Sequence, residues 1–248
     1  SNPTAVLNVY NWGQYISDGS EESLDVNAAF EEWYEKTYGV KVKVNYSTYA
    51  SNEDMYAKLK SGAVSYDVII PSDYMIERMI AEDMLASLNY DNMPHIGNIH
   101  PDFFGPDAVY DYYDPDNKYT VIYQWGVTAL VYDKTKVENT PKNWDALWDE
   151  DLKGDILMIN NSRDAMAVAM QQLGINPATC TKEDVDKATE KLKEQKPLVK
   201  KYVMDQVFNE MQNNQSAIAA YYAGDIAMMM EENEDLAFYL PENQGFNL

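Results

Sequence analysis

The chain has 248 residues, of which 46% are hydrophobic and 12% aromatic, so it can bury a core large enough for one large domain or two lobes. Its 41 acidic and 19 basic residues give a formal net charge of -22, which repels nucleic acid and anionic lipid and attracts cations. The single cysteine, Cys180, excludes an internal disulfide and a multi-thiolate metal site, and no apolar run is long enough for a membrane span.

The first part of the chain predicts alternating strands and helices. Residues 40–46 alternate strictly between apolar and polar, as a half-buried strand does, and residues 68–70 form a continuous apolar run, which indicates a strand covered on both faces. The predicted elements are a strand at 7–11, a helix at 24–38 ending at Gly39, a strand at 40–46, a helix capped by Ser51 and a strand at 68–70. This βαβαβ order predicts a parallel sheet.

A crossing between two lobes is expected near the middle of the chain. The segment Pro71–Tyr74 opens a further helix, and residues 90–117 have the Asp, Pro and Asn content of a surface loop before a long strand at 119–132. Later elements are expected at 144–148, 156–159, 166–173, 181–192, 217–222, 224 onward and 236–240. We therefore predict one lobe from residues 1–124 plus 237–248, incomplete at its C-terminus, and a second lobe from residues 125–236.

Three aromatic blocks follow predicted strands: Tyr10–Tyr15, Pro71–Tyr74 and Tyr123–Gly126. Open α/β sheets bind ligands at the carboxyl ends of their strands. Aromatic faces attract cations, and carboxylates hold ammonium groups. In so acidic a chain, the blocks indicate a pocket for an organic cation.

The tryptophans fall into two groups. Helical spacing places Trp33, Trp144 and Trp148 among residues that pack helices. The better candidates for ligand contact are the aromatic residues that follow strands: Trp12, Tyr15, Tyr74 and Trp125. Trp125, near the expected crossing, is equally suited to packing a hinge.

Catalytic and metal-binding patterns are weak. His95, His100 and Asp102 lie close together, but a metal site there would need further ligands from distant sequence. The sequence has no phosphate-binding loop, nucleophile elbow or zinc-type His-Glu spacing. A carboxylate-based hydrolase stays open as an alternative of another class, because folding could bring two of the many acids together. We predict neither catalytic residues nor a bound metal or cofactor.

Several ordered blocks resemble the spermidine/putrescine-binding proteins of bacterial polyamine ABC importers. They are residues 10–15, 46–49, 51–53, 55–59 and 66–72, and the likeness runs along nearly all of the chain. The resemblance implies an α/β, two-lobe periplasmic-binding-protein fold of type II, whose ligand cleft lies between lobes joined by a hinge. It also implies that the chain is C-terminally truncated, because a later aromatic-x-Asp element of the family is absent.

The resemblance also implies ligand contacts. Trp12, Tyr15, Ser72 and Tyr74 match the family pattern, while Gly13 stands where some members have a polar residue. We expect the aromatic rings to pack the alkyl chain and ammonium groups, and Ser72 to bind an amine.

In the second lobe the resemblance is looser. Some members have two acids on the turn after a strand, where this chain has Asn161 and Asp164, so one anionic contact is missing. Tyr222 replaces a common tryptophan but keeps a ring face, and Met204 stands where a serine can occur.

The expected function is capture of putrescine or spermidine for a membrane permease, by a monomer that binds no nucleic acid and is not an enzyme. Such a protein works outside the cytoplasm, in the periplasm or as a lipoprotein on the outer face of the cytoplasmic membrane. Because Asn161 removes a charge, another small organic cation or a zwitterion is the alternative ligand.

Overall fold

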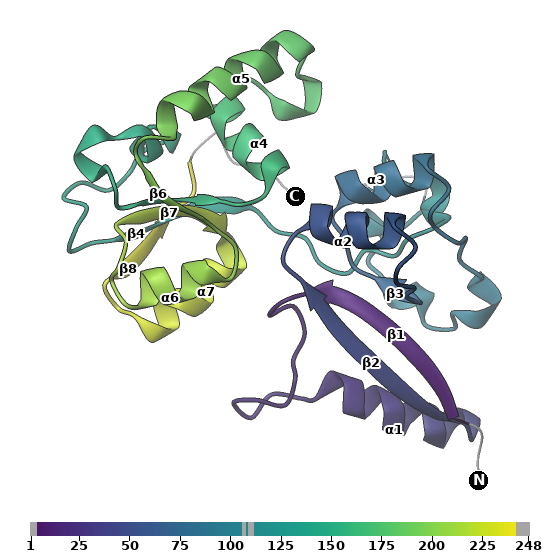
Figure 1. The fold of residues 1–248 in the computed structure, drawn as a ribbon. Helices are drawn as coiled ribbons and strands as arrows, with labels where there is room; N and C mark the ends of the chain where they lie inside the picture. Colours follow the sequence, from purple (N-terminus) through teal and green to yellow (C-terminus); the bar gives the residue numbers. More distant parts are fainter. Residues whose placement is uncertain (1–3, 106–107, 109–111, 242–248) are drawn as a thin grey trace. The chain divides into compact units, whose positions relative to one another are not determined.

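The computed structural model describes residues 4–105, 108 and 112–241. The chain forms two compact units that divide between Gln124 and Trp125 (Figure 1). Each unit is an α/β layer structure with its own sheet. None of the helices in the described ranges has both the length and the apolar composition of a transmembrane helix.

The first unit is built on a three-stranded parallel sheet of order β2-β1-β3. The strands are β1 (Thr4–Trp12), β2 (Lys41–Tyr49) and β3 (Val68–Ile69), and the helices are α1 (Val26–Tyr38), α2 (Asn52–Lys60) and α3 (Asp73–Ala81). Helix α1 lies on one face of the sheet, and α2 and α3 lie on the other (Figure 1). The predicted βαβαβ order and parallel pairing are confirmed.

Local signals fix the helix ends as expected. Gly39 ends α1 with a φ of 70°, a left-handed conformation that glycine adopts without strain. Ser51 caps α2, because its Oγ accepts a hydrogen bond from the Asp54 amide at 3.1 Å. One cluster of buried residues in this unit joins the sheet to helices α2 and α3, and it consists of Tyr10, Tyr49, Met55, Met75 and Met79.

Two predictions for the first half of the chain are wrong. Val68 is 43% exposed, so β3 is not covered on both faces, and it extends over two residues only. The long strand expected at 119–132 begins only at residue 128. Residues 120–126 belong to no strand, and Val127 forms a single bridge, in which its carbonyl accepts from the Ala223 amide at 2.9 Å. The backbone pairs with β7 from Thr128 onward and also with β8 from Leu130 onward.

The loop before this strand is more ordered than its composition suggests. It contains 3-10 turns at Tyr90–Asn92, Ile96–Asn98, Pro101–Phe103 and Pro115–Asn117. The buried carboxylate of Asp114 accepts hydrogen bonds from the amides of Lys118, Tyr119 and Thr120, and from the Thr120 hydroxyl. This carboxylate therefore replaces backbone pairing in the segment that follows it.

The second unit has a five-stranded mixed sheet of order β6-β5-β7-β4-β8. The strands are β4 (Thr128–Asp133), β5 (Ile156–Ile159), β6 (Val199–Val203), β7 (Ile218–Tyr222) and β8 (Leu236–Tyr239). The helices are α4 (Ser162–Gln172), α5 (Lys182–Gln195), α6 (Gln206–Gln212) and α7 (Ala223–Glu232), with 3-10 turns at Trp144–Trp148, Glu150–Leu152 and Pro177–Thr179. Helices α4 and α5 cover one face, and α6 and α7 cover the other (Figure 1).

Two tryptophans of this unit pack helices, as predicted. Trp144 is fully buried and its indole N–H donates to Gln171 Oε1 at 3.2 Å. Trp148 donates to the Lys191 carbonyl at 2.9 Å and so joins its turn to α5. Trp33 instead remains 43% exposed on α1, where its ring packs beside Phe30.

Strand β8 differs from the expected domain division. We assigned residues 237–248 to the first lobe, but Ala237–Tyr239 pair antiparallel with β4 in the second unit. β4 thereby has a hydrogen-bonded neighbour on each side, β7 and β8. Residues 242–248 lie outside the described residues.

Candidate functional site

The carboxyl ends of β1, β2 and β3 meet at one edge of the first sheet, since the strands are parallel. Trp12 ends β1 there, and its half-buried ring lies 4.8 Å from that of Tyr49, at the end of β2. The Tyr49 hydroxyl donates to the carbonyl of Ile70, just beyond β3. This hydrogen bond fixes the chain immediately before Ser72.

The turn after β1 carries Gly13 and Tyr15. Gln14 between them has a φ of 51°, so the backbone turns sharply away from the strand. The Tyr15 ring lies edge-on to that of Tyr123, with centroids 5.4 Å apart, and the Tyr123 hydroxyl donates to the Tyr15 carbonyl at 2.7 Å. Tyr123, which was not a predicted contact, therefore holds the predicted contact Tyr15 in place.

Ser72 and Tyr74 lie together at the start of α3. Buried Asn52 donates to Ser72 Oγ at 3.0 Å and to the Tyr74 hydroxyl at 2.8 Å, and it accepts from the Ser72 amide at 3.1 Å. The Tyr74 hydroxyl also lies 3.2 Å from Glu53 Oε1, to which it donates. The structure thus brings two predicted contacts into one hydrogen-bond network.

In the second unit, Asp164 and Tyr222 are also brought together. Asp164 lies in the first turn of α4 and is 3% exposed, and Tyr222 ends β7. The Tyr222 hydroxyl donates to Asp164 Oδ2 at 2.7 Å. A carboxylate and a tyrosine hydroxyl are therefore hydrogen-bonded at this sheet edge.

Asn161 has an evident structural role. Its Oδ1 accepts hydrogen bonds from the amides of Arg163 and Asp164 at 3.0 and 3.3 Å, so it caps α4. It supplies no negative charge to a ligand.

Trp125, the first residue of this unit, is 49% exposed, and Met204 is buried at the end of β6.

Two carboxylates that the sequence analysis did not assign lie at the same edge. Asp205 follows β6 and Asp225 lies in the first turn of α7, directly after β7. Burial, together with the charge of Asp205, raises the pKa of Asp225 to about 6, and burial raises the pKa of Asp205. Burial and the charges of Asp225, Asp205 and Asp164 raise the pKa of Tyr221, which is 2% exposed. This edge therefore has an excess of negative charge that a cation would relieve.

A sequence signal for Asp225 existed. It follows a strand and opens a helix, as Asp164 does, but only Asp164 matched an acid of the resembled family and so became a candidate. Asp205 had no such signal, because β6 and α6 were not predicted.

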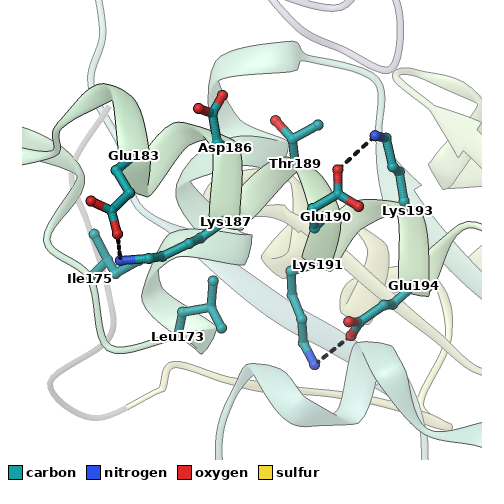
Figure 2. Close-up of a pocket in the computed structure, with 10 residues that line it drawn as sticks. All are labelled: Leu173, Ile175, Glu183, Asp186, Lys187, Thr189, Glu190, Lys191, Lys193 and Glu194. Carbon is teal, nitrogen blue, oxygen red and sulfur yellow. Dashed lines mark hydrogen bonds and ion pairs between the residues drawn. The ribbon is translucent and has the colours of Figure 1, made fainter.

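A hollow elsewhere on the second unit has a different character. Its volume is about 870 Å³, and it is lined by helix α5 and the end of α4 (Figure 2). The side chains along it pair with one another, as Lys187 does with Glu183 at 3.0 Å and Lys193 with Glu190 at 2.7 Å. These pairs are those of a solvated helix surface, and we do not assign the ligand to this hollow. Within the described residues, no cluster of His, Cys, Asp and Glu side chains is arranged to hold a metal ion.

Comparison with known families decides the class of protein. Residues 28–248 match the bacterial extracellular solute-binding proteins. The chain belongs to this family. The family consists of substrate-binding proteins of transporters, so the hydrolase alternative is wrong.

Named relatives of this solute-binding protein are polyamine-binding proteins. The spermidine/putrescine-binding periplasmic protein of Escherichia coli is 28% identical over 243 residues, which are 96% of this chain and 64% of the relative. The putrescine-binding periplasmic protein PotF of the same organism is 28% identical over 232 residues, covering 89% of this chain and 59% of PotF. The chain thus spans less than two thirds of the length of these relatives.

Solved structures agree on the fold. A putative spermidine/putrescine ABC transporter protein from Listeria monocytogenes superposes with a TM-score of 0.80 at 32% identity, covering 98% of this chain and 71% of that one. The spermidine/putrescine ABC transporter substrate-binding protein PotD from Streptococcus pneumoniae gives a TM-score of 0.69 at 32% identity, with coverages of 96% and 68%. The predicted α/β, two-lobe periplasmic-binding-protein fold is confirmed.

Proposed function

We propose that this solute-binding protein captures a polyamine, putrescine or spermidine, for an ABC importer. The observation that carries the proposal is the group of carboxylates at the carboxyl edge of the second sheet, where the Tyr222 hydroxyl bonds Asp164 at 2.7 Å and the charges of Asp164, Asp205 and Asp225 all act on Tyr221. A flexible chain with ammonium ends satisfies such an edge, because ring faces and carboxylates both favour cations.

The residue roles follow from their chemistry. We assign Asp164 and Ser72 to amine groups, and Trp12, Tyr15, Tyr74 and Tyr222 to the alkyl chain and ammonium faces. Each cation-π contact is worth about 0.5–2 kcal/mol, and each charge-assisted hydrogen bond about 1.5–3 kcal/mol. A few contacts of each kind suffice for a micromolar dissociation constant. Gly13 and Trp125 are assigned as flanking contacts, and Asn161 as a cap that places Asp164.

The setting follows that of the relatives, which are named as periplasmic binding proteins. We propose that the protein works as a monomer outside the cytoplasmic membrane, in the periplasm or anchored to the outer face as a lipoprotein. It would deliver its ligand to the permease of the importer. A net charge of -22 disfavours nucleic acid as a partner.

One observation favours a second ligand class. Asn161 is uncharged at a position where a second acid would strengthen amine binding. Its Oδ1 caps α4 instead. Another small organic cation or a zwitterion, which needs fewer carboxylates, is therefore the competing ligand.

Titration calorimetry with putrescine, spermidine and a zwitterionic amino acid tests the proposal. It is performed on this chain and on the chain extended to the length of its relatives. We expect micromolar polyamine binding that weakens about 10- to 100-fold in Asp164→Asn, because one charge-assisted hydrogen bond is lost. Asp186→Asn on the exposed surface of α5 removes the same charge and should bind as the wild type does. Preference for the amino acid would favour the alternative, and no polyamine heat from either folded protein would refute the proposal.

A further inference from the structure

Asn52 occupies a position that helix propensity does not explain. It is the first residue of α2 and only 1% exposed, although asparagine is a poor helix former and a buried amide is costly without hydrogen bonds. Its amide oxygen accepts from the Ser72 amide, and its nitrogen donates to the hydroxyls of Ser72 and Tyr74. One buried side chain therefore joins α2 to the first residues of α3.

Ser72 provides the second observation. It stands at the N-cap of α3, where a serine hydroxyl ordinarily accepts from a backbone amide of the first turn, yet it makes no side-chain capping bond. Its Oγ accepts from Asn52 instead, at 3.0 Å. Ser51, at the same position of α2, does cap its helix. The Ser72 hydroxyl therefore does not cap α3 and is held by the hydrogen bond from Asn52 instead.

The direction of these bonds matters for a cationic ligand. Because the Asn52 nitrogen has two N–H groups and donates both, the Ser72 and Tyr74 oxygens are held at one fixed spacing. The Tyr74 hydroxyl hydrogen is directed to Glu53, 3.2 Å away. The bonds therefore set the position of both oxygens and the orientation of the Tyr74 ring.

We propose that Asn52 is a positioning residue for ligand binding, which fixes the Ser72 hydroxyl and the Tyr74 ring against the polyamine. This inference rests on the proposed function, in which Ser72 and Tyr74 contact the ligand. It adds that affinity depends on a residue buried behind the contact surface.

The test compares Asn52→Leu with two other variants in polyamine titrations. Asn52→Leu keeps the number and branching of the side-chain heavy atoms and removes all three hydrogen bonds, and we expect the dissociation constant to rise about tenfold or more. Asn52→Asp retains an acceptor for the Ser72 amide and can accept from the Ser72 hydroxyl, but it loses the bond to Tyr74, whose hydroxyl donates to Glu53, so it should restore only part of the affinity. Ser51→Ala weakens the same helix end and should leave the affinity unchanged. Equal losses in Asn52→Leu and Ser51→Ala would overturn the inference.

A double-mutant cycle and a ligand-free signal complete the test. Tyr74→Phe should weaken binding in the wild type but have little further effect in Asn52→Leu, since the hydroxyl is already displaced. In 3-fluorotyrosine-labelled protein without ligand, the Tyr74 resonance should shift or broaden in Asn52→Leu and stay in place in Ser51→Ala. Additive losses, or an unchanged Tyr74 resonance, would overturn the inference. Failure of both this chain and its extended form to bind polyamine would refute the proposed function, and the fluorine spectrum alone would then decide whether Asn52 positions Tyr74.

Discussion

Replacing Asp225 by asparagine should stabilise the protein at neutral pH and have no effect in acid. Burial, and then the charge of Asp205, raises the pKa of Asp225 to about 6 from an ordinary value of 3.8. Between these two values the folded state binds more protons than the unfolded state does. The unfolding free energy therefore falls as pH rises through this window and stays lowered above it.

The size of the effect follows from the pKa difference. At about 1.36 kcal/mol per pKa unit, the rise from 3.8 to about 6 corresponds to roughly 3 kcal/mol. The Asp225 side chain is partly exposed, so solvent screening reduces this free-energy difference to about 1–2 kcal/mol. Asp225→Asn removes the charge while keeping the shape, and it should recover this amount at pH 7.5 but not at pH 4.

Urea unfolding of wild type and Asp225→Asn between pH 4 and pH 7.5 measures the difference. Glu138→Gln, which removes one exposed carboxylate, controls for the change in net charge. The difference between Asp225→Asn and the wild type should grow with pH, and that for Glu138→Gln should remain near zero. Parallel curves for Asp225→Asn and wild type across the whole range would refute the reasoning.

Three further substitutions test individual contacts, each by urea unfolding. Leu130→Ala shortens a fully buried side chain in β4 and should lower the unfolding free energy by about 2–5 kcal/mol. A loss below about 1 kcal/mol would mean that the site collapses around the smaller residue. Ser51→Ala removes the α2 cap and should cost about 1 kcal/mol, whereas no change would contradict the capping bond. Tyr222→Phe loses the 2.7 Å bond to Asp164 and should cost about 1–2 kcal/mol; a gain would show that the bond is strained.

Elements with strong local signals were predictable from the sequence. The strand at 156–159 is a short apolar run and has the predicted bounds. Thr181 and Asp184 form the predicted capping box, since each side chain bonds the backbone of the other. In these places the residues that define the element also carry its hydrogen bonds.

Elements that depend on distant partners were not predictable. Strand β6 contains Lys200 and Lys201, which break the apolar pattern, but it is an edge strand and both lysines pair with Glu210. β8 was predicted as a strand, whereas its pairing with β4 depends on a strand about a hundred residues earlier in the chain.

The candidate site shows the same division. Rings that follow strands identified Trp12 and Tyr15 as candidates, because the position of a strand end can be inferred from the sequence. Tyr222 became a candidate through the family resemblance. The connections behind them could not be inferred. Asn52 is twenty residues from Ser72 in the chain, and only the folded structure shows that they are bonded. The ligand contacts themselves stay predictions.

The rings of the first sheet also give the protein a built-in optical reporter. Tyr66 stacks on Tyr10 with centroids 4.3 Å apart, Tyr10 lies 4.9 Å from Tyr49, and Tyr49 lies 4.8 Å from Trp12. Because tyrosine emission overlaps tryptophan absorption, light absorbed anywhere along this row is passed to Trp12. The Trp12 part of the protein's fluorescence, which adds to that of four other tryptophans, would therefore respond to a ligand that contacts this ring, without an attached dye.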